Sequence, residues 1–427
     1  MNTEQLHSLF LTSEGISTDT RKLIPGSIFF ALKGDNFNGN KFAADALKGG
    51  CAYAVIDEKE FAVSDQFIQV ENVLQSLQQL ANYHRKQFKI PVIGITGSNG
   101  KTTTKELIGA VLSTTYNTLI TEGNLNNHLG VPLTLLRLNM DHEIAIIEMG
   151  ASKPGDIQEL AEIAEPTHGI ITNIGAAHIE GFGSLQGVVK TKTELYRFIQ
   201  SSGGILFCNS EDETLNTNLP AGTTVIYYGK NSGSVTGKIT SLTPFVNFIW
   251  SENNQTQPEI LSKLVGAYNF DNFLAAICIG RFFNVSADNV NEALSAYTPS
   301  NKRSQVEKTE RNTLIVDCYN ANATSMKAAL ENFIAIPHEN KLAVLGDMLE
   351  LGPISKEEHQ KIVDYLADKK TQVFLVGQEF GNTTTSFEKF KTSDELLKSG
   401  KLNSVNDHLI LIKGSRGIKL ESVISSL

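Results

Sequence analysis

Residues 92–104, VIGITGSNGKTTT, run from an apolar segment into a turn that holds two glycines, a lysine and three threonines. The segment VIGIT predicts a strand, and KELIGAVLSTT (105–115) predicts a helix after the turn. Glycines allow backbone N–H groups to face an anion, and a helix start adds the positive end of its dipole. This order favours a phosphate-binding loop over the alternative, an ordinary glycine-rich turn with a helix cap.

The side chains of the turn suit an ATP-type nucleotide. Lys101 can reach the β- and γ-phosphates, and the Thr102 hydroxyl can bind Mg²⁺. The strict motif has glycine where this chain has Ile95, so the loop is a variant. The predicted nucleotide-binding residues of the loop are Gly97, Ser98, Asn99, Gly100, Lys101, Thr102 and Thr103.

Strand and helix patterns on both sides of the loop divide the 427 residues into three predicted units, 1–88, 89–298 and 299–427. Near-continuous apolar runs in the central unit are typical of parallel strands buried on both faces, whereas residues 235–250 favour an antiparallel edge. The expected fold class is α/β, with a small N-terminal unit, a central, mostly parallel sheet and a C-terminal doubly wound, Rossmann-like unit. Further strands are expected at 26–34, 51–57, 143–150, 168–175, 204–209, 224–229, 313–320, 341–348, 371–378 and 408–415, and further helices at 72–88 and 268–283, with another ending near Tyr297.

Bulk composition excludes several classes of function. With 37 Lys and Arg against 46 Asp and Glu, the net charge of −9 argues against nucleic acid or a membrane surface as the main partner. No apolar run reaches the roughly 18 residues that a membrane span needs, and the N-terminus lacks the pattern of a signal peptide. The four widely spaced cysteines predict buried free thiols in a reducing compartment. We therefore expect a cytoplasmic protein.

Polar side chains follow the expected strands at the sheet edge where α/β proteins form their sites. Glu148 ends the run 143–150, where it would complete a Mg²⁺ site with Thr102 or else be a solvated strand end. His178 follows the next run; a lone histidine is usually structural, but its place at the same edge favours a function. Residues 121–136, with three asparagines and two glycines, predict a loop that offers amide groups to a polar ligand.

Together these segments resemble the Mur ligase superfamily, whose members join amino acids to a cell-wall precursor. The resemblance spans the whole chain and includes TGSNGKTTT (96–104) and GAYNFDNFLAA (266–276). It implies that Asn269, which opens the N-x-x-N pair with Asn272, approaches adenine. It also implies that Arg303 and Asp317 contact the nucleotide from the C-terminal unit.

The resemblance implies a second metal ligand set. Lys192 lies fourteen residues after His178 and resembles the family lysine that CO₂ carbamylates and that holds a second Mg²⁺ with the histidine. Lys190 is a near neighbour, and Lys192 is preferred for its spacing and for the ELY that follows. The implied catalytic residues are Lys101, His178 and Lys192, and the implied ligands of two Mg²⁺ ions are Thr102, Glu148, His178 and carbamylated Lys192.

Five segments in the right order are similar to superfamily members that add D-alanyl-D-alanine to UDP-N-acetylmuramoyl-tripeptide. They are GNLNNHLGVPLTLLRL (123–138), NIGAAHIEGFGSLQGVVKTKTELY (173–196), DCYNANATSM (317–326), LGDMLELG (345–352) and KGSRG (413–417). One departure is Ala323, where the family usually has proline; the change loosens a turn and removes no chemical group.

The resemblance also implies substrate-binding residues. Residues 17–50 look like a uridine-nucleotide-binding domain, and the end of each strand in the third unit is a candidate for the dipeptide pocket. Each candidate in the third unit is equally consistent with a capping or turn role. The implied residues for the UDP substrate are Ser17, Thr18, Asp19, Thr20, Arg21, Lys33, Asn124, Asn126 and Asn127, and those for the dipeptide are Asn320, Asn322, Asp347 and Glu350.

The implied activity is an ATP-dependent amide ligation through an acyl phosphate, which yields the pentapeptide precursor for peptidoglycan synthesis and hence cell wall biogenesis, cell shape and cell division. Because an acyl phosphate hydrolyses in water, we expect residues after about 299 to rotate and close the site. We expect a monomer that acts on these small molecules. The alternatives are the tripeptide-forming ligase or folylpolyglutamate synthase of the same superfamily, and a nucleotide-dependent switch or scaffold. Whether the tripeptide ends in lysine or diaminopimelate stays open.

Overall fold

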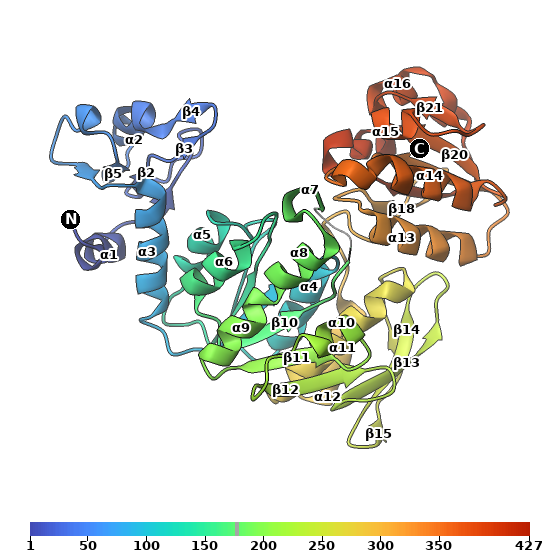
Figure 1. The fold of residues 1–427 in the computed structure, drawn as a ribbon, viewed down its shortest axis with the longest axis horizontal. Helices are drawn as coiled ribbons and strands as arrows, with labels where there is room; N and C mark the ends of the chain where they lie inside the picture. Colours follow the sequence, from blue (N-terminus) through green and yellow to red (C-terminus); the bar gives the residue numbers. More distant parts are fainter. Residues whose placement is uncertain (176–178) are drawn as a thin grey trace.

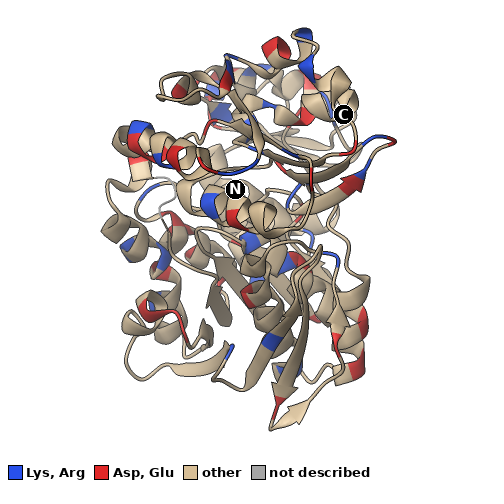
Figure 2. Cartoon of the chain, turned by 90° about the vertical axis from the view of Figure 1, so that its right-hand side faces the viewer, with Lys and Arg blue, Asp and Glu red and all other residues tan. Residues whose placement is uncertain are grey.

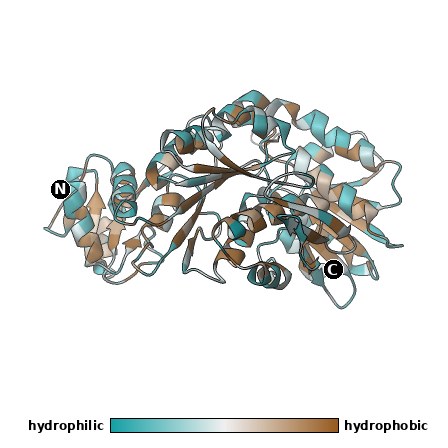
Figure 3. Cartoon of the chain, turned by 90° about the horizontal axis from the view of Figure 1, so that it is seen from below, coloured by the Kyte–Doolittle hydropathy of each residue, from teal (hydrophilic) through white to brown (hydrophobic). Residues whose placement is uncertain are grey.

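The structure is a computed structural model that describes residues 1–175 and 179–427. Its α/β units follow one another along the long axis, with the N-terminal strands at one end and the last strands at the other (Figures 1 and 3). Within the described ranges, each sheet takes its strands from one predicted unit. The predicted mixed α/β fold is confirmed, and the boundaries 88/89 and 298/299 stay a prediction.

The N-terminal sheet is parallel, in the order β1-β2-β5-β6, and a short β3–β4 hairpin lies beside it. Asn2 and Asn72 cap the first and third helices by accepting backbone hydrogen bonds, so both helices begin where a cap is available. The elements are α1 (Thr3–Leu11), β1 (Ile16–Ser17), β2 (Ile28–Phe30), β3 (Lys33–Gly34), β4 (Phe37–Asn38), η1 (Gly39–Phe42), α2 (Ala43–Lys48), β5 (Tyr53–Ile56), η2 (Lys59–Phe61), β6 (Phe67–Gln69) and α3 (Val73–Arg85).

Helix α3 joins the N-terminal unit to the central unit. Its residues Leu77 and Leu80 are fully buried, in one apolar core with Val131 and Leu160 of the central unit. The helix was expected at 72–88 and ends three residues earlier, at Arg85. Its apolar face is therefore shared between two units.

The central sheet has the order β15-β14-β13-β12-β11-β10-β7-β9-β8, with β16 paired to β14. Strands β7 to β12 pair in parallel, while β13 and β14 pair antiparallel, as residues 235–250 indicated. Its elements are β7 (Val92–Thr96), α4 (Lys101–Leu112), β8 (Thr118–Ile120), α5 (Gly130–Leu135), β9 (Ile144–Glu148), α6 (Asp156–Ala164), β10 (His168–Ile171), α7 (Ile179–Phe182), α8 (Leu185–Lys192), α9 (Glu194–Ser201), β11 (Ile205–Asn209), α10 (Glu213–Thr217), β12 (Thr224–Gly229), β13 (Val235–Ser241), β14 (Asn247–Glu252), β15 (Gln255–Thr256), β16 (Ile260–Leu261), η3 (Ala267–Asn269), α11 (Phe270–Phe282) and α12 (Ala287–Ala296).

Two local expectations for the central unit need correction. Helix α4 begins at Lys101 rather than at residue 105, because Gly100 adopts a left-handed conformation that turns the chain into the helix. The segment 121–136 was expected to be a loop, but its second half forms α5. The side chain of Asn127 accepts hydrogen bonds from the backbone N–H groups of Leu129 and Gly130, which stabilises the start of that helix.

The C-terminal sheet has the order β17-β18-β22-β19-β20-β21 and is parallel except where β17 meets β18. The four predicted strands correspond to β18, β19, β20 and β22, and the short edge strands β17 and β21 were missed. The elements are β17 (Gln305–Lys308), β18 (Thr313–Asp317), α13 (Ala323–Ala335), β19 (Lys341–Gly346), η4 (Gly352–Ile354), α14 (Ser355–Leu366), β20 (Gln372–Val376), α15 (Gln378–Gly381), β21 (Glu388–Phe390), α16 (Ser393–Lys398), η5 (Lys401–Ser404), β22 (Leu409–Lys413), η6 (Arg416–Ile418) and η7 (Leu420–Ser426).

The hydrophobic segments lie along the strands and on the inner faces of the helices, which are hydrophilic outside (Figure 3). All four cysteines are buried free thiols, as predicted. In the part of the chain that the structure describes, no helix has the length and apolarity to cross a membrane.

Candidate active site

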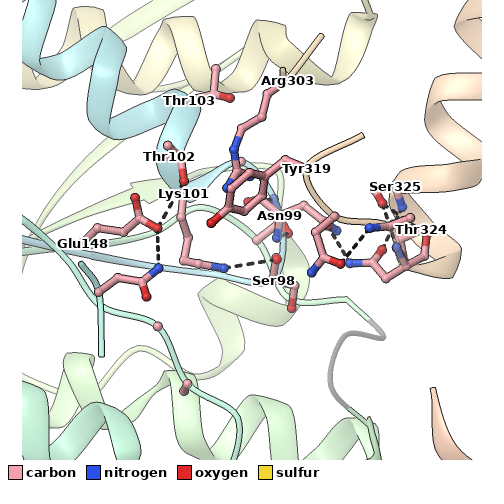
Figure 4. A pocket seen from close by; sticks show the side chains of 18 of the residues that line it. Ser98, Asn99, Lys101, Thr102, Thr103, Glu148, Arg303, Tyr319, Thr324 and Ser325 are labelled. Carbon is pink, nitrogen blue, oxygen red and sulfur yellow. Dashed lines mark hydrogen bonds between the residues drawn. The ribbon is translucent and has the colours of Figure 1, made fainter. Parts of the chain in front are cut away.

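A cavity of about 650 Å³ lies between the central and the C-terminal units. The phosphate loop, the asparagine segment and the chain after β9 form its central wall. Residues from 303–304, 317–328 and 349–350 form the opposite wall, and Figure 4 shows side chains of both walls meeting there. The carboxyl ends of β7, β9, β10 and β18 therefore surround one space, as expected for parallel sheets.

The conformation of the phosphate loop requires its two glycines. Gly97 has a φ of +149°, and a Cβ there would lie 1.9 Å from Oγ1 of Thr172. Gly100 has a φ of +78°, and a Cβ there would meet Asn272 at 2.8 Å. The chain after β10 also fixes the loop, because Asn173 accepts hydrogen bonds from the backbone of Ser98 at 2.9 Å and of Asn99 at 3.0 Å.

Helix α4 starts directly after this loop. Backbone N–H groups in the first turn of a helix have no partner within it, so they can bind a phosphate. Nζ of Lys101 donates to the carbonyl oxygens of Gly97 at 2.7 Å and Ser98 at 3.3 Å. Burial lowers the pKa of Lys101 to about 8; the charge of Glu148 opposes this shift and that of Arg303 adds to it. A phosphate beside Lys101 would place a negative charge next to this buried ammonium and so stabilise its charged form.

Glu148 lies at the end of β9, buried behind the phosphate loop. Its Oε1 accepts hydrogen bonds from Thr102 Oγ1 at 3.2 Å and from Asn126 Nδ2 at 2.8 Å. Its Oε2 is buried and accepts no hydrogen bond from the described residues, although Nζ of Lys105 lies 3.5 Å away. Both Glu148 and Lys105 are almost fully buried, at 1% and 2% exposure of their side chains.

These oxygens fit a magnesium ion. Mg²⁺ prefers a few hard oxygen ligands and keeps several waters, so a hydroxyl and a carboxylate with one unbonded oxygen form a suitable donor set. Among the described residues, no cluster of three or more His, Cys, Asp or Glu side chains is placed to hold a metal. A metal here would therefore rely on Thr102, Glu148 and phosphate oxygens.

The second implied ligand set is described only in part. His178 lies outside the described residues. Lys192 is 1% exposed, and its Nζ lies 5.8 Å above the ring of Phe182. Burial, together with the charge of Lys101, holds the pKa of Lys192 well below its ordinary value. Lys190 is exposed, so the structure separates the two neighbouring lysines.

Asn269 and Arg303 both line the cavity. The amide of Asn269 is buried and donates to the carbonyl of Val265 at 2.8 Å, while its oxygen accepts from Asn272 at 2.9 Å. The guanidinium of Arg303 lies 3.8 Å from the ring centroid of Tyr319, a cation–π contact. Figure 4 shows Arg303 and Tyr319 beside the start of α4.

Asp317 also lines the cavity, at the end of β18. Its Oδ2 accepts a hydrogen bond from Lys413 at 2.6 Å, and the lysine side chain is 2% exposed. Its Oδ1 lies 3.4 Å from the backbone N–H of Ser304. Asp317 is thus tied to both β22 and the chain that enters the C-terminal unit.

Three of the four dipeptide candidates, Asn320, Asn322 and Glu350, line the cavity. Asn322 caps α13 and also donates through Nδ2 to Oδ1 of Asn99 at 2.8 Å, which joins the two walls. Asp347 does not belong to the cavity wall among the described residues. Its carboxylate accepts hydrogen bonds from the backbone of Glu379 and Phe380, both at 2.9 Å, so it stabilises α15 instead.

The candidates for the UDP substrate divide between two places. Asn126 and Asn127 line the cavity, whereas Asn124 is exposed and is not part of its wall as described. The N-terminal candidates, Ser17, Thr18, Asp19, Thr20, Arg21 and Lys33, belong to the first unit.

Several of these N-terminal side chains have partners within that unit. Ser17 is buried against Ser27 at 2.8 Å between hydroxyl oxygens. Arg21 pairs with Asp19 at 2.7 Å. Lys33 lies 2.8 Å from carboxylate oxygens of both Asp57 and Glu58.

Sequence reasoning missed Lys105, Tyr319 and Lys413. Lys105 follows Lys101 by one helical turn, so the spacing placed both lysines on one face of α4. Tyr319 lies inside the quoted segment 317–326, between two candidates. Lys413 had no such signal, because its contact with Asp317 depends on the pairing of β18 with β22.

Three family models match the chain. They are "Mur ligase family, catalytic domain" over residues 12–85, "Mur ligase middle domain" over residues 95–280 and "Mur ligase, glutamate ligase domain" over residues 302–416. The matched ranges hold the N-terminal candidates, the phosphate loop with Glu148 and Lys192, and the C-terminal wall of the cavity.

Similar proteins cover nearly the full length of the chain. The UDP-N-acetylmuramoyl-tripeptide–D-alanyl-D-alanine ligase of Bacillus subtilis (strain 168) is 35% identical, over 97% of this chain and 93% of the relative. A crystal structure of MurF from Acinetobacter baumannii has a TM-score of 0.88 at 30% identity, covering 100% and 98% of the two chains. MurF from Thermotoga maritima, solved in complex with ADP, has a TM-score of 0.87 at 27% identity, covering 98% and 97%.

Proposed function

The chain belongs to the Mur ligase family and is a ligase, and we propose that it adds D-alanyl-D-alanine to UDP-N-acetylmuramoyl-tripeptide while ATP is converted to ADP and inorganic phosphate. The observation that carries the proposal is the cavity in which the phosphate loop and Glu148 face Arg303 and Asn322 of another unit. The names of the full-length relatives and the ADP complex of a structural neighbour support the substrates.

The chemistry we propose has two steps. An oxygen of the tripeptide's terminal carboxylate attacks the γ-phosphorus of ATP, and ADP leaves with the electrons of the broken P–O bond. The free amine of the dipeptide then attacks the carbonyl carbon of the acyl phosphate, loses a proton, and expels inorganic phosphate. Because two anions meet in the first step, cationic groups must offset their repulsion.

Lys101 is the cation of the phosphate loop in this proposal. It would exchange its hydrogen bonds to Gly97 and Ser98 for phosphate oxygens, while the first turn of α4 holds the phosphates. Thr102 and Glu148 would hold one Mg²⁺, and His178 with carbamylated Lys192 a second. When bound, such ions neutralise phosphate charge.

Burial supports the assignment of Lys192. A buried ammonium is costly unless it is paired, and this side chain is 1% exposed near the positive charge of Lys101. A carbamate would replace that charge with an anionic oxygen ligand suited to Mg²⁺. Lys190 is exposed and serves as the matched control.

The remaining contacts are proposed by their place in the fold. Asn269, Arg303 and Asp317 would contact the nucleotide, and Asn320, Asn322 and Glu350 the dipeptide, from their positions on the cavity wall. Asn126 and Asn127 would face the peptidyl part of the UDP substrate, whose nucleotide end would bind the N-terminal unit. Asp347 is left out, because the backbone of α15 already uses its carboxylate.

We propose that the protein works as a monomer in the cytoplasm without nucleic-acid or membrane partners. The net charge of −9 argues against nucleic acid or a membrane surface as a partner. In Figure 2, the blue Lys and Arg segments and the red Asp and Glu segments are interspersed along the visible ribbon.

The proposal is tested by phosphate release from ATP with the UDP-tripeptide and different acceptors. We expect release with D-alanyl-D-alanine, a nucleotide product heavier by that dipeptide, and loss of activity in Lys192→Ala but not in Lys190→Ala. Release with a single amino acid on a shorter precursor would instead indicate the tripeptide-forming ligase. A glutamate acceptor on a folate would indicate folylpolyglutamate synthase, and phosphate release without any acceptor a switch. Precursors that end in lysine or diaminopimelate, compared side by side, identify the third residue.

A further inference from the structure

Glu106 connects the phosphate-binding helix to the chain that enters the C-terminal unit. It lies on α4, one turn beyond the loop, and its Oε2 accepts a hydrogen bond from the hydroxyl of Tyr297 at 2.5 Å. Nδ2 of Asn301 lies 2.9 Å from both oxygens of the same carboxylate. One side chain of the central unit thus contacts both ends of residues 297–301, between α12 and β17.

The two contacts act on an unusually constrained piece of backbone. Lys302 and Ser304 have φ angles of +58° and +51°, which residues with side chains seldom adopt. Such conformations persist only where neighbouring contacts hold them. Glu106 holds the chain before Lys302, and on the far side Tyr268 and Asn269 hold the hydroxyl of Ser304 at 2.8 and 3.3 Å.

Arg303 lies between these two constrained residues. Its guanidinium lies over the ring of Tyr319 and lines the cavity beside the phosphate loop. We propose that Glu106 is a positioning residue, which holds residues 297–304 against α4 so that Arg303 faces the nucleotide. This inference rests on the proposed function, because it assumes that the nucleotide site lies in this cavity.

Asn301 shows why the carboxylate matters. Its Oδ1 is buried without a hydrogen-bond partner among the described residues, so the bonds that Nδ2 donates to Glu106 fix this side chain. Without the carboxylate, Asn301 and Tyr297 would each lose their acceptor in a partly buried place. The chain before Arg303 would then be free to leave its strained conformation.

The test is a double-mutant cycle on ADP binding, which requires no ligation. Calorimetry would give the Kd of ADP with Mg²⁺ for the wild type, Glu106→Ala, Arg303→Ala and the double variant. We expect each single variant to bind roughly tenfold more weakly, a factor that corresponds to about 1.4 kcal/mol. If Glu106 acts through Arg303, the double variant binds no more weakly than Arg303→Ala alone. If the rise in the Kd of ADP in the double variant equals the product of the rises in the two single variants, the inference is overturned.

Controls separate positioning from general destabilisation. Glu292→Ala removes an exposed glutamate from α12 and should leave the Kd of ADP unchanged. If Glu106→Ala does not fold, Glu106→Gln takes its place, because glutamine has one acceptor oxygen where the carboxylate has two. In assays of ligation, the KM of ATP should rise about tenfold in Glu106→Ala while the KM of the UDP-tripeptide stays the same. Equal rises in both would contradict a role at the nucleotide site.

The outcomes also distinguish this inference from the proposed function. If the wild type binds ADP but the effects of Glu106→Ala and Arg303→Ala on the binding free energy simply add, only the role of Glu106 is overturned. ADP binding with the expected cycle but no dipeptide ligation would overturn only the proposed function. A wild-type chain that binds no ADP would contradict both.

Discussion

Two buried charged side chains, Lys105 and Glu148, lie 3.5 Å apart behind the phosphate loop. Glu148 is aligned by Thr102 and Lys105 of α4 and by Asn126, which precedes α5. A buried carboxylate without an opposite charge is costly, so Lys105 offsets part of the cost of placing Glu148 there. The pair keeps a buried carboxylate beside the phosphate loop.

We predict that Lys105→Met lowers the free energy of unfolding by about 3–5 kcal/mol, because it leaves Glu148 buried and unpaired. The additional change Glu148→Gln should recover part of that loss, since it removes the unpaired charge. Denaturant unfolding of the two variants and the wild type measures both effects. A loss of less than about 1 kcal/mol, the size of an exposed ion pair, would show that the pair contributes little.

At the scale of single residues, short-range patterns were enough to predict where some of the candidate residues lie, while their roles stay a prediction. Gly97, Gly100 and Lys101 belong to one local motif, and Glu148 ends an apolar run, so short-range patterns were sufficient. Asp347 also follows a strand, but its partners in α15 are more than thirty residues away. The pattern left a capping role open for Asp347 but could not identify these partners. It also could not predict the contact of Lys105 with Glu148, which requires β7 and β9 to be neighbours.

At the scale of elements, the junction of α1 and α3 carries a pair of buried histidines. Nε2 of His7 lies 3.0 Å from Nδ1 of His84, and Nε2 of His84 lies 2.9 Å from the carbonyl oxygen of Leu138 in the central unit. If His84 donates to that carbonyl, its Nδ1 is the acceptor for His7. Protonation of Nδ1 would break the bond between the rings.

This arrangement predicts a loss of stability in acid. Burial lowers the pKa of both His7 and His84 from the ordinary value of 6.5. Below that pH the unfolded chain binds more protons than the folded chain, so the free energy of unfolding falls as the pH falls. Denaturant unfolding at several pH values between 7 and 5 measures this effect. The free energy of unfolding should fall less in His84→Gln than in the wild type or in the control His338→Gln, whose histidine is exposed. Equal slopes in all three would contradict the prediction.

Long apolar strands such as β7, β9 and β11 were predicted nearly to the residue, because burial on both faces leaves a continuous apolar run. The edge strands β17 and β21 were missed, since an edge strand is short and half exposed and its pattern resembles a loop. The start of α4 was placed four residues late because the threonines after Lys101 are weak helix formers, and the helix depends on Gly100 for its first turn.

At the scale of the whole molecule, the site exists only where two units meet. The hydrogen bond between Asn322 and Asn99 joins the C-terminal unit to the phosphate loop. Glu106 in turn joins α4 to the chain that leads into the C-terminal unit. Sequence patterns predict each sheet separately and carry little information on how sheets face each other. The cavity itself therefore required the structure.

We predict that the C-terminal unit closes on its ligands. Filling the cavity with nucleotide and UDP-tripeptide should add contacts between the walls, and rotation of the segment after about residue 299 would bring them together. Small-angle scattering with and without an ATP analogue plus the UDP-tripeptide should show a smaller radius of gyration in the bound state. Identical scattering curves at saturating ligand would contradict closure.

We propose that this cavity activates a carboxylate by phosphorylation and passes the acyl group to an amine. The most direct measurement uses UDP-N-acetylmuramoyl-tripeptide with ¹⁸O in its terminal carboxylate, together with ATP and D-alanyl-D-alanine. If the carboxylate attacks the γ-phosphorus, mass spectrometry will find one ¹⁸O atom in each inorganic phosphate released and the other in the new amide. Phosphate without ¹⁸O would mean that water, not the carboxylate, attacks ATP, and it would contradict the account.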